Sequence, residues 1–228
     1  MEQRTFDWYR ARLGKFTAST ISDLMTKGRG KDELFGKTAL TLINQVAYER
    51  MLNPVVVDDD AEDGLFADYL YFTNTESKAM RWGIEQEPVA RSLYCIAAHI
   101  PTDKVVETGS VAHKQLHMLA ASPDGLVDDD GLVEIKCVGS ASFMRYLEVT
   151  DGDTLKAIEP KYYWQVQCQL ACTDRAWCDF VVYNPFVAQP LHIARIDRNA
   201  ADIALMLERV VLANEMADDI VNKHLNSK

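Results

Sequence analysis

The stretch "SPDGLVDDDGLVEIKCVG", residues 122–139, joins a turn, an apolar segment, an acidic turn and a second apolar segment. This pattern predicts two adjacent strands connected by the acidic turn. Side chains two residues apart on a strand share one face of the sheet. Glu134 and Lys136 therefore point to the same face, while their strand neighbours point into a core. A strand that is otherwise buried thus presents an acid and a base side by side.

The sequence around this stretch predicts a mixed β-sheet flanked by helices, an α/β fold class. Strands are expected within residues 104–111, 117–138, 177–185 and 190–197, and helices within 17–25, 38–52, 159–173 and 199–225. A further helix is expected to begin at Glu85 to Glu87 and to end before Pro101, because Pro88 is best tolerated in a first helical turn. Residues 53–78 predict a loop with a short element near 66–72. No repeat or linker is visible, so we predict a single domain over residues 1–228.

The composition is that of an ordinary globular protein, with 48% hydrophobic and 25% charged residues among 228. No apolar run reaches the roughly 18 residues that a membrane-spanning helix needs, so no membrane association is expected. The N-terminal segment lacks the apolar region of a secretory signal. The five cysteines are scattered and odd in number, which argues against a disulfide framework. These features predict a protein of a reducing cytoplasm.

The charge is distributed unevenly along the chain. The net charge of −10 would by itself argue against a nucleic-acid partner, because DNA binding needs Lys and Arg to neutralise phosphates. However, residues 1–37 contain eight Lys or Arg against five Asp or Glu, whereas residues 51–75 contain six acidic residues and no basic one. A local basic face on an acidic protein is therefore possible.

Asp124 lies ten residues before Glu134 and directly after an apolar segment. Two neighbouring antiparallel strands would bring the two carboxylates together, where they repel each other unless a cation lies between them. Mg²⁺ prefers such oxygen ligands, and Lys136 beside it could orient a water molecule or stabilise charge on a phosphate. The alternative is that Ser-Pro-Asp-Gly is simply a turn and that Glu134 and Lys136 form a surface ion pair.

Two further polar positions fit the same hypothesis. Glu87 follows a Trp-Gly pair near the expected start of a helix, and Gln165 and Gln167 lie among bulky apolar residues of another helix. Each of them is alternatively an ordinary solvent-facing helix residue.

Taken in order, these motifs resemble a known family. They are Trp82-Gly83-x-x-x-Glu87, Ser122-Pro123-Asp124-Gly125, Glu134-Ile135-Lys136-Cys137 and Gln165-Val166-Gln167, preceded by Trp8-x-x-x-Arg12-Leu13-Gly14 and Thr17-Ala18-Ser19. The set is similar to phage lambda exonuclease and the YqaJ-type viral recombinase nucleases, a branch of the PD-(D/E)XK nuclease superfamily. The resemblance runs from about residue 7 to residue 185 and implies a restriction-endonuclease-like core. Residues 55–76 and the final helix depart from it.

The resemblance implies a role for each matching residue. Asp124, Glu134 and the backbone carbonyl of Ile135 would bind a divalent metal, with Glu87 supporting a second ion directly or through water. The implied cofactor is Mg²⁺, with Mn²⁺ as a substitute and two ions in each active site. Lys136 would position and activate the nucleophilic water, and Gln165 would orient Lys136 or that water.

The resemblance also implies how the substrate is held. Arg12, Ser19 and Ser122 would together bind a 5′-terminal phosphate. Arg29, in the basic loop Gly28-Arg29-Gly30, is our candidate for a contact with the DNA backbone, with a solvated surface loop as the alternative.

The implied activity is a Mg²⁺-dependent exonuclease that degrades one strand of linear double-stranded DNA from 5′ to 3′. It would leave 3′ single-stranded tails for phage-type recombination in the cytoplasm of a bacterial host. The implied assembly is a ring-shaped homotrimer that works with a single-strand annealing protein. The alternatives are a restriction-like or junction-resolving endonuclease of the same superfamily, and a catalytically inactive module that binds DNA ends.

Overall fold

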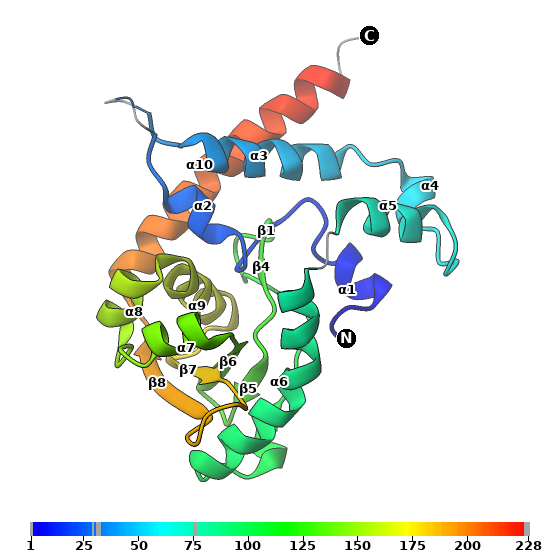
Figure 1. Ribbon diagram of the computed structural model, residues 1–228. Helices are drawn as coiled ribbons and strands as arrows, with labels where there is room; N and C mark the ends of the chain where they lie inside the picture. Colours follow the sequence, from blue (N-terminus) through cyan, green and yellow to red (C-terminus); the bar gives the residue numbers. More distant parts are fainter. Residues whose placement is uncertain (1, 29, 31–32, 75–76, 226–228) are drawn as a thin grey trace.

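A five-stranded mixed sheet forms the centre of the structure, a computed structural model that describes residues 2–28, 30, 33–74 and 77–225 (Figure 1). Its strand order is β2-β5-β6-β7-β8. The strands span Val105–Val106, Gly125–Val127, Gly131–Cys137, Trp177–Tyr183 and Leu191–Asp197. β6 pairs with β5 in antiparallel and with β7 in parallel orientation. The "SPDGLVDDDGLVEIKCVG" stretch therefore supplies two adjacent antiparallel strands, as predicted, of which β6 is the middle strand of the sheet.

A smaller sheet of order β1-β4-β3 lies beside the first. Its strands span Phe16–Thr17, Leu119–Ala121 and Val111–Ala112 for β1, β4 and β3. β1 pairs in parallel with β4, with Phe16 opposite Leu119. This pairing brings the N-terminal segment alongside the residues that lead into Ser122 and Asp124.

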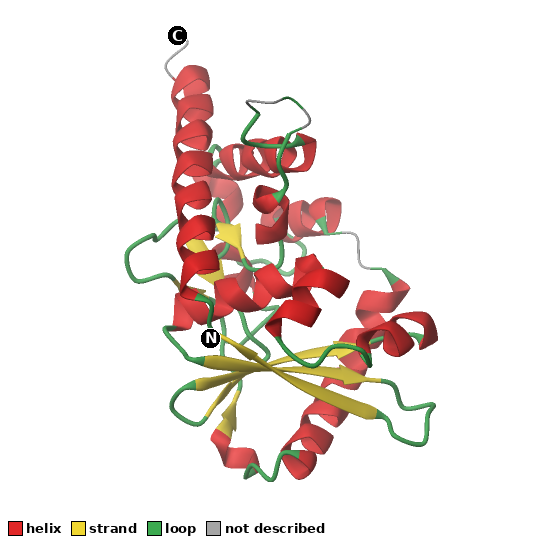
Figure 2. Ribbon diagram, turned by 90° about the vertical axis from the view of Figure 1, so that its left-hand side faces the viewer, coloured by secondary structure: helices red, strands yellow, loops and turns green. Residues whose placement is uncertain are grey.

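Helices cover both faces of the central sheet (Figure 2). On one face, helix α6 (Lys78–Ala97) packs with Ala90 and Tyr94 against Val133, Ile135 and other strand side chains. On the other face lie α7 (Ser140–Tyr146), α8 (Gly152–Ile158) and α9 (Pro160–Thr173). α9 is the most enclosed helix, because all residues from Tyr163 to Cys172 are buried. It begins with Pro160 in its first turn and ends at Asp174, which adopts a left-handed backbone conformation.

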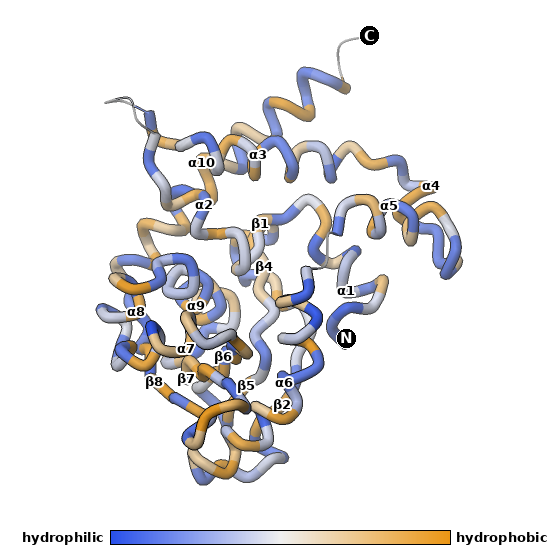
Figure 3. Tube along the Cα trace, viewed as in Figure 1, coloured by the Kyte–Doolittle hydropathy of each residue, from blue (hydrophilic) through white to orange (hydrophobic). Residues whose placement is uncertain are grey.

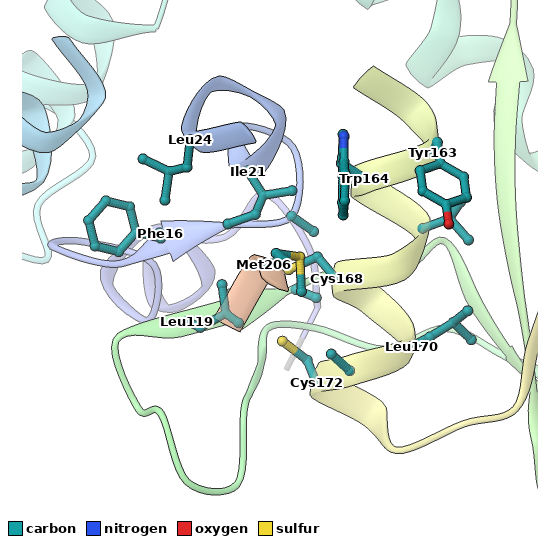
Figure 4. Packing of buried hydrophobic residues seen from close by; sticks show 14 of the residues in the cluster. Phe16, Ile21, Leu24, Leu119, Tyr163, Trp164, Cys168, Leu170, Cys172 and Met206 are labelled. Atoms are coloured by element: carbon teal, nitrogen blue, oxygen red, sulfur yellow. The ribbon is translucent and has the colours of Figure 1, made fainter. Parts of the chain in front are cut away.

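Further helices cover the outer side of α9. α2 (Ile21–Met25) contributes Ile21 and Leu24, and α10 (Ala200–Leu225) contributes Met206, to the same core as Cys168 and Leu119 (Figure 4). α3 (Lys37–Arg50) adds Ile43 to this core. α10 alternates hydrophobic and hydrophilic segments along its length (Figure 3), as expected for a helix with one buried face. The buried Arg209 of α10 donates hydrogen bonds to the carbonyls of Leu24 and Leu34, which ties this helix to the α2 region.

Besides α2, the described N-terminal part carries three more short helices, and a 3₁₀ turn follows α6. They are α1 (Phe6–Arg10), α4 (Pro54–Val57), α5 (Leu65–Thr73) and η1 (Thr102–Lys104). Arg10 joins α1 to the acidic segment after α4: it pairs with Asp60 and donates to the carbonyls of Val57 and Asp59. Across the described ranges, no helix is both long and apolar enough to cross a membrane.

The main departure from the predicted elements is the start of α6. The helix begins at Lys78, not at Glu85 to Glu87, and Pro88 lies in its interior. The Ser77 side chain accepts a hydrogen bond from the Met80 amide and so caps an earlier first turn. Proline removes one hydrogen bond of the helix but does not prevent a helix that is capped upstream.

Several short elements were not predicted. The strand β1 overlaps the start of the helix expected within 17–25, and α4 lies in the expected loop of residues 53–78. The helices α7 and α8 lie in a segment for which we expected no regular structure. The short element expected near 66–72 is α5, and the helices expected over 38–52, 159–173 and 199–225 are α3, α9 and α10, whose ends agree within two residues.

Candidate active site

The central strand β6 brings the sequence motif to one place. β5 begins at Gly125, which lies opposite Val133, so residues 134–137 of the antiparallel strand β6 extend past β5. At this free edge the backbone amide of Ile135 donates a 2.7 Å hydrogen bond to Asp124 Oδ2. The N–H and C=O of one strand residue point to the same edge, so the Ile135 carbonyl faces the side on which Asp124 lies.

Glu134 is held through both of its carboxylate oxygens. Oε1 accepts hydrogen bonds from Lys136 Nζ at 2.5 Å and from Gln165 Nε2 at 2.6 Å. Oε2 accepts a hydrogen bond from Gln169 Nε2 at 2.6 Å. The side chain is almost completely buried, and a buried carboxylate is tolerated only when such partners replace water.

Lys136 is enclosed by groups that favour its positive charge. Its ammonium lies 4.5 Å from the centre of the Tyr162 ring and 3.5 Å from Gln165 Oε1. Burial alone would lower the pKa of Lys136, but the carboxylates of Glu134 and Asp124 outweigh it and raise that pKa above its usual value.

Asp124, by contrast, lies in an environment that disfavours its charged form. Burial raises the pKa of its carboxyl well above the usual value, and the nearby charges of Glu134 and Glu87 raise it further. Glu87 is thus close enough to influence the site, yet its own oxygens are occupied: Oε2 pairs with Arg4 at 3.1 Å and Oε1 with Arg91 at 2.7 Å.

The donor set of this site fits a hard divalent cation. Asp124 and Glu134 supply carboxylate oxygens, and the Ile135 carbonyl lies on the same edge. Mg²⁺ is commonly bound through one or two carboxylates while it keeps several waters. The mutual repulsion that raises the Asp124 pKa is the repulsion that such a cation would relieve. Among the described residues, no group of three or more His, Cys, Asp or Glu side chains is arranged to hold a metal by itself, so carbonyl and water oxygens would have to complete the shell.

A second cluster joins the three residues expected to bind phosphate. Arg12 donates from Nη1 to Ser122 Oγ at 3.1 Å and from Nη2 to Ser19 Oγ at 3.4 Å. The guanidinium lies 4.3 Å from the centre of the Trp8 ring, and Trp8 Nε1 also donates to Ser122 Oγ at 3.0 Å. Burial lowers the pKa of Arg12, although an arginine remains cationic at any physiological pH.

The small sheet explains how these residues meet. β1 carries the chain toward Ser19, and its partner β4 leads into Ser122, so residues far apart in sequence become neighbours. Ser122 is only two residues from Asp124, which places this cluster next to the carboxylates. A cavity of about 510 Å³ opens on the Arg12 side of this cluster, lined by Arg12, Trp8, Ser19 and residues of α3, α5 and α6 but not by Asp124 or Glu134. α2 has only five residues, so an anion would depend on these side chains rather than on a helix terminus.

The structure brings together four residues that the sequence predicted for the site, Asp124, Glu134, Lys136 and Gln165. We did not predict Gln169 and Tyr162, both on α9. Gln169 follows Gln165 by one helical turn, a spacing that places two side chains on one face, and this was the available signal. Gln167 points elsewhere: its side chain donates to the Asp197 carbonyl at 2.9 Å and accepts from the Asn199 amide at 2.8 Å. Arg29 lies outside the described residues.

Comparison with solved structures gives close matches over nearly the whole chain. The crystal structure of an alkaline exonuclease from Laribacter hongkongensis has 32% sequence identity and a TM-score of 0.72, and the match covers 97% of this chain and 96% of that chain. The same exonuclease in complex with dAMP matches with 31% identity and a TM-score of 0.73, covering 97% and 98%. A phage-related exonuclease from Haemophilus somnus, with 15% identity, a TM-score of 0.67 and coverage of 92% and 96%, shares the fold.

Fold and site together define a nuclease of the phage exonuclease class. The sequence model of the YqaJ-like viral recombinase domain matches residues 7–176, which is well over half of the chain. The chain belongs to this family, as its motifs indicated. No curated protein sequence matches it.

Proposed function

We propose that the protein is a Mg²⁺-dependent exonuclease that hydrolyses one strand of linear double-stranded DNA from its 5′ end. The observation that supports this most directly is the geometry of Asp124, Glu134 and Lys136 around the free edge of β6. The bound dAMP of the Laribacter hongkongensis exonuclease, a nucleoside monophosphate, is consistent with release of single nucleotides.

Asp124, Glu134 and the Ile135 carbonyl would hold Mg²⁺, for which Mn²⁺ substitutes. The ion would stabilise the negative charge that develops on the attacking and leaving oxygens. Glu87 would support a second ion, directly or through water, after giving up a contact with Arg4 or Arg91.

The protein residues would act on a water molecule and on the scissile phosphate. The Lys136 ammonium would donate a hydrogen bond to the attacking water and stabilise the phosphate, and Gln165, which contacts both Lys136 and Glu134, would orient it. The water oxygen bonds to phosphorus in line with the departing 3′ oxygen. The attacking water loses a proton to solvent, the departing 3′ oxygen takes one from solvent and leaves with the terminal nucleotide, and the next nucleotide keeps the phosphate as its new 5′ end.

The Arg12 cluster would select the substrate end. A guanidinium can contact two phosphate oxygens at once, and the hydroxyls of Ser19 and Ser122 already lie within hydrogen-bonding distance of it. A 5′-terminal phosphate held there would place the next phosphodiester beside Asp124. The products would be 3′ single-stranded tails for recombination.

The proposal includes the setting in which the enzyme works. By its family we infer a homotrimeric ring around DNA, a single-strand annealing protein as partner, and action in the cytoplasm of a bacterial host. Sizing by mass photometry tests the trimer independently of the activity.

One assay separates this function from its rivals. The protein is incubated with linear and with covalently closed circular duplex DNA, in Mg²⁺ or in EDTA. We expect Mg²⁺-dependent digestion of the linear DNA alone. Nicking of the circle would indicate an endonuclease, and binding of ends without cleavage would indicate an inactive module.

A further inference from the structure

Gln169 contacts the catalytic centre from a position with no role in the function described so far. Its side chain is fully buried on α9, and Nε2 donates a 2.6 Å hydrogen bond to Glu134 Oε2. The direction of the amide is fixed by chemistry: a carboxylate oxygen only accepts hydrogen bonds, so the NH₂ group of Gln169 must face it.

The carbonyl oxygen of the same amide makes no compensating interaction with the described residues. Gln169 Oε1 is buried and has no hydrogen-bond partner among the residues that the structure describes. Burying a polar atom without a partner is unfavourable. Packing alone would therefore favour an apolar side chain here, and the contact with Glu134 is the one benefit that glutamine brings.

The two oxygens of Glu134 differ in what they can still accept. Among the residues that the structure describes, Oε1 accepts hydrogen bonds from Lys136 and Gln165, whereas Oε2 accepts one from Gln169 alone. Each carboxylate oxygen can accept about two partners, so Oε2 keeps the capacity to bind a cation. The bonds to Oε1 hold one end of the carboxylate, and the hydrogen bond from Gln169 is the direct contact that holds Oε2 among the described residues.

We propose that Gln169 is a positioning residue that fixes Glu134 Oε2 for metal binding, as the partner of Gln165 in a clamp of two glutamines one helical turn apart. This inference rests on the proposed role of Glu134 as a metal ligand. Gln169 itself touches neither metal nor DNA.

Gln167 offers a matched control on the same helix. It is equally buried and also makes hydrogen bonds through its amide, but to the backbone of Asp197 and Asn199, between the end of β8 and the start of α10. Methionine has nearly the shape of glutamine and no amide, so Gln169→Met and Gln167→Met remove comparable groups from the two sides of α9.

The test is calorimetric titration of Mn²⁺ into each variant without DNA, combined with thermal unfolding in EDTA and with steady-state kinetics. We expect Gln169→Met to weaken Mn²⁺ binding by about 10-fold or more and to lower kcat, with KM for DNA changed less than about 2-fold. Gln167→Met should lower Tm but leave Mn²⁺ affinity unchanged. If Gln169→Met does not fold, Gln169→Asn, which keeps the amide but shortens its reach, takes its place.

Three results would be decisive against the inference or its basis. Mn²⁺ affinity unchanged in the Gln169 variant, with an active parent enzyme, overturns the positioning role and leaves the proposed function intact. If Gln167→Met weakens Mn²⁺ binding as much as Gln169→Met does, the loss of affinity reflects general destabilisation of the fold, and the positioning role is overturned. A parent protein that binds no Mn²⁺ overturns both proposals.

Discussion

The backbone amide of Ile135 donates a 2.7 Å hydrogen bond to the carboxylate of Asp124, at the point where β5 begins and the antiparallel strand β6 extends past it. This bond holds Asp124 at the strand edge, beside the residue that follows Glu134. It explains how a turn motif and a strand motif eleven residues apart form one site. It also makes Asp124 the residue whose loss should affect the chemistry most cleanly.

Asp124→Ala should abolish cleavage while binding to duplex DNA survives. The substitution removes a proposed metal ligand but leaves Arg12 and the N-terminal basic residues in place. We expect the rate to fall by at least about 10²–10³-fold, with duplex affinity within about 2-fold of the parent. Single-turnover digestion and fluorescence anisotropy measure the two effects, and near-normal turnover would remove Asp124 from the active site.

Mg²⁺ should raise the Tm of the parent protein and not that of Asp124→Asn. A ligand at ten times its Kd adds about 1.4 kcal/mol of stability, which corresponds to roughly 3–6 °C for a chain of this size. Asp129→Asn, in the exposed turn between β5 and β6, is the matched control and should keep the full shift. Thermal scans over a Mg²⁺ series give the result; an undiminished shift in Asp124→Asn would place the ion elsewhere.

A 5′-phosphorylated duplex should be digested faster than a 5′-hydroxyl duplex, and Arg12→Ala should shrink the difference. Charge-assisted hydrogen bonds contribute about 1.5–3 kcal/mol, so the preference should be about 10- to 100-fold. The variant should still hydrolyse DNA slowly, because Asp124, Glu134 and Lys136 are intact. Initial rates on the two substrates provide the measurement, and equal rates with the unaltered protein would exclude the phosphate pocket.

Asp202 should stabilise the fold at neutral pH but not in acid. Burial would raise the pKa of its carboxyl, but hydrogen bonds from Lys156 and Tyr163, at 2.7 and 2.5 Å, lower it below the ordinary 3.8. A carboxyl with a lowered folded-state pKa contributes stability that is present above its unfolded pKa and is lost as the pH falls through its folded pKa.

Asp202→Asn should therefore reduce the free energy of unfolding by about 1–2 kcal/mol at pH 7, with the deficit shrinking below pH 3.8. Urea unfolding at a series of pH values tests this. Asp219→Asn, exposed on the same helix α10, should have little effect at any pH. A deficit that stays constant down to pH 2 would show that the ion pair is not its cause.

The sequence predicted the parts of the fold that depend on local pattern. Periodic apolar residues located α3, α9 and α10, and alternation located β6 with Glu134 and Lys136 on one face. The start of α6 was misplaced because Pro88 was given more weight than the Ser77 cap, which only the upstream chain reveals. α7 and α8 were missed because their seven residues are too few for a clear helical period.

In the candidate site, too, the sequence predicted what depends on local pattern and not what depends on packing. Residues within one motif were found, whereas Gln169 and the Arg4 and Arg91 contacts of Glu87 depend on how α9, α6 and the N-terminus pack. Such contacts connect residues far apart in sequence, and no local pattern specifies them. The cluster of Arg12, Ser19 and Ser122 was anticipated only through resemblance, since its assembly requires the parallel pairing of β1 with β4.

The most direct test of the account is the direction of digestion. One strand of a linear duplex carries a fluorescent label on its 5′-terminal nucleotide and a different label on its 3′-terminal nucleotide. The duplex is incubated with the protein and Mg²⁺, and with Asp124→Ala in parallel. The account predicts early release of the 5′ label on a mononucleotide, late release of the 3′ label, and neither release by the variant. Release of the 3′ label first, or of both labels by Asp124→Ala, would contradict it.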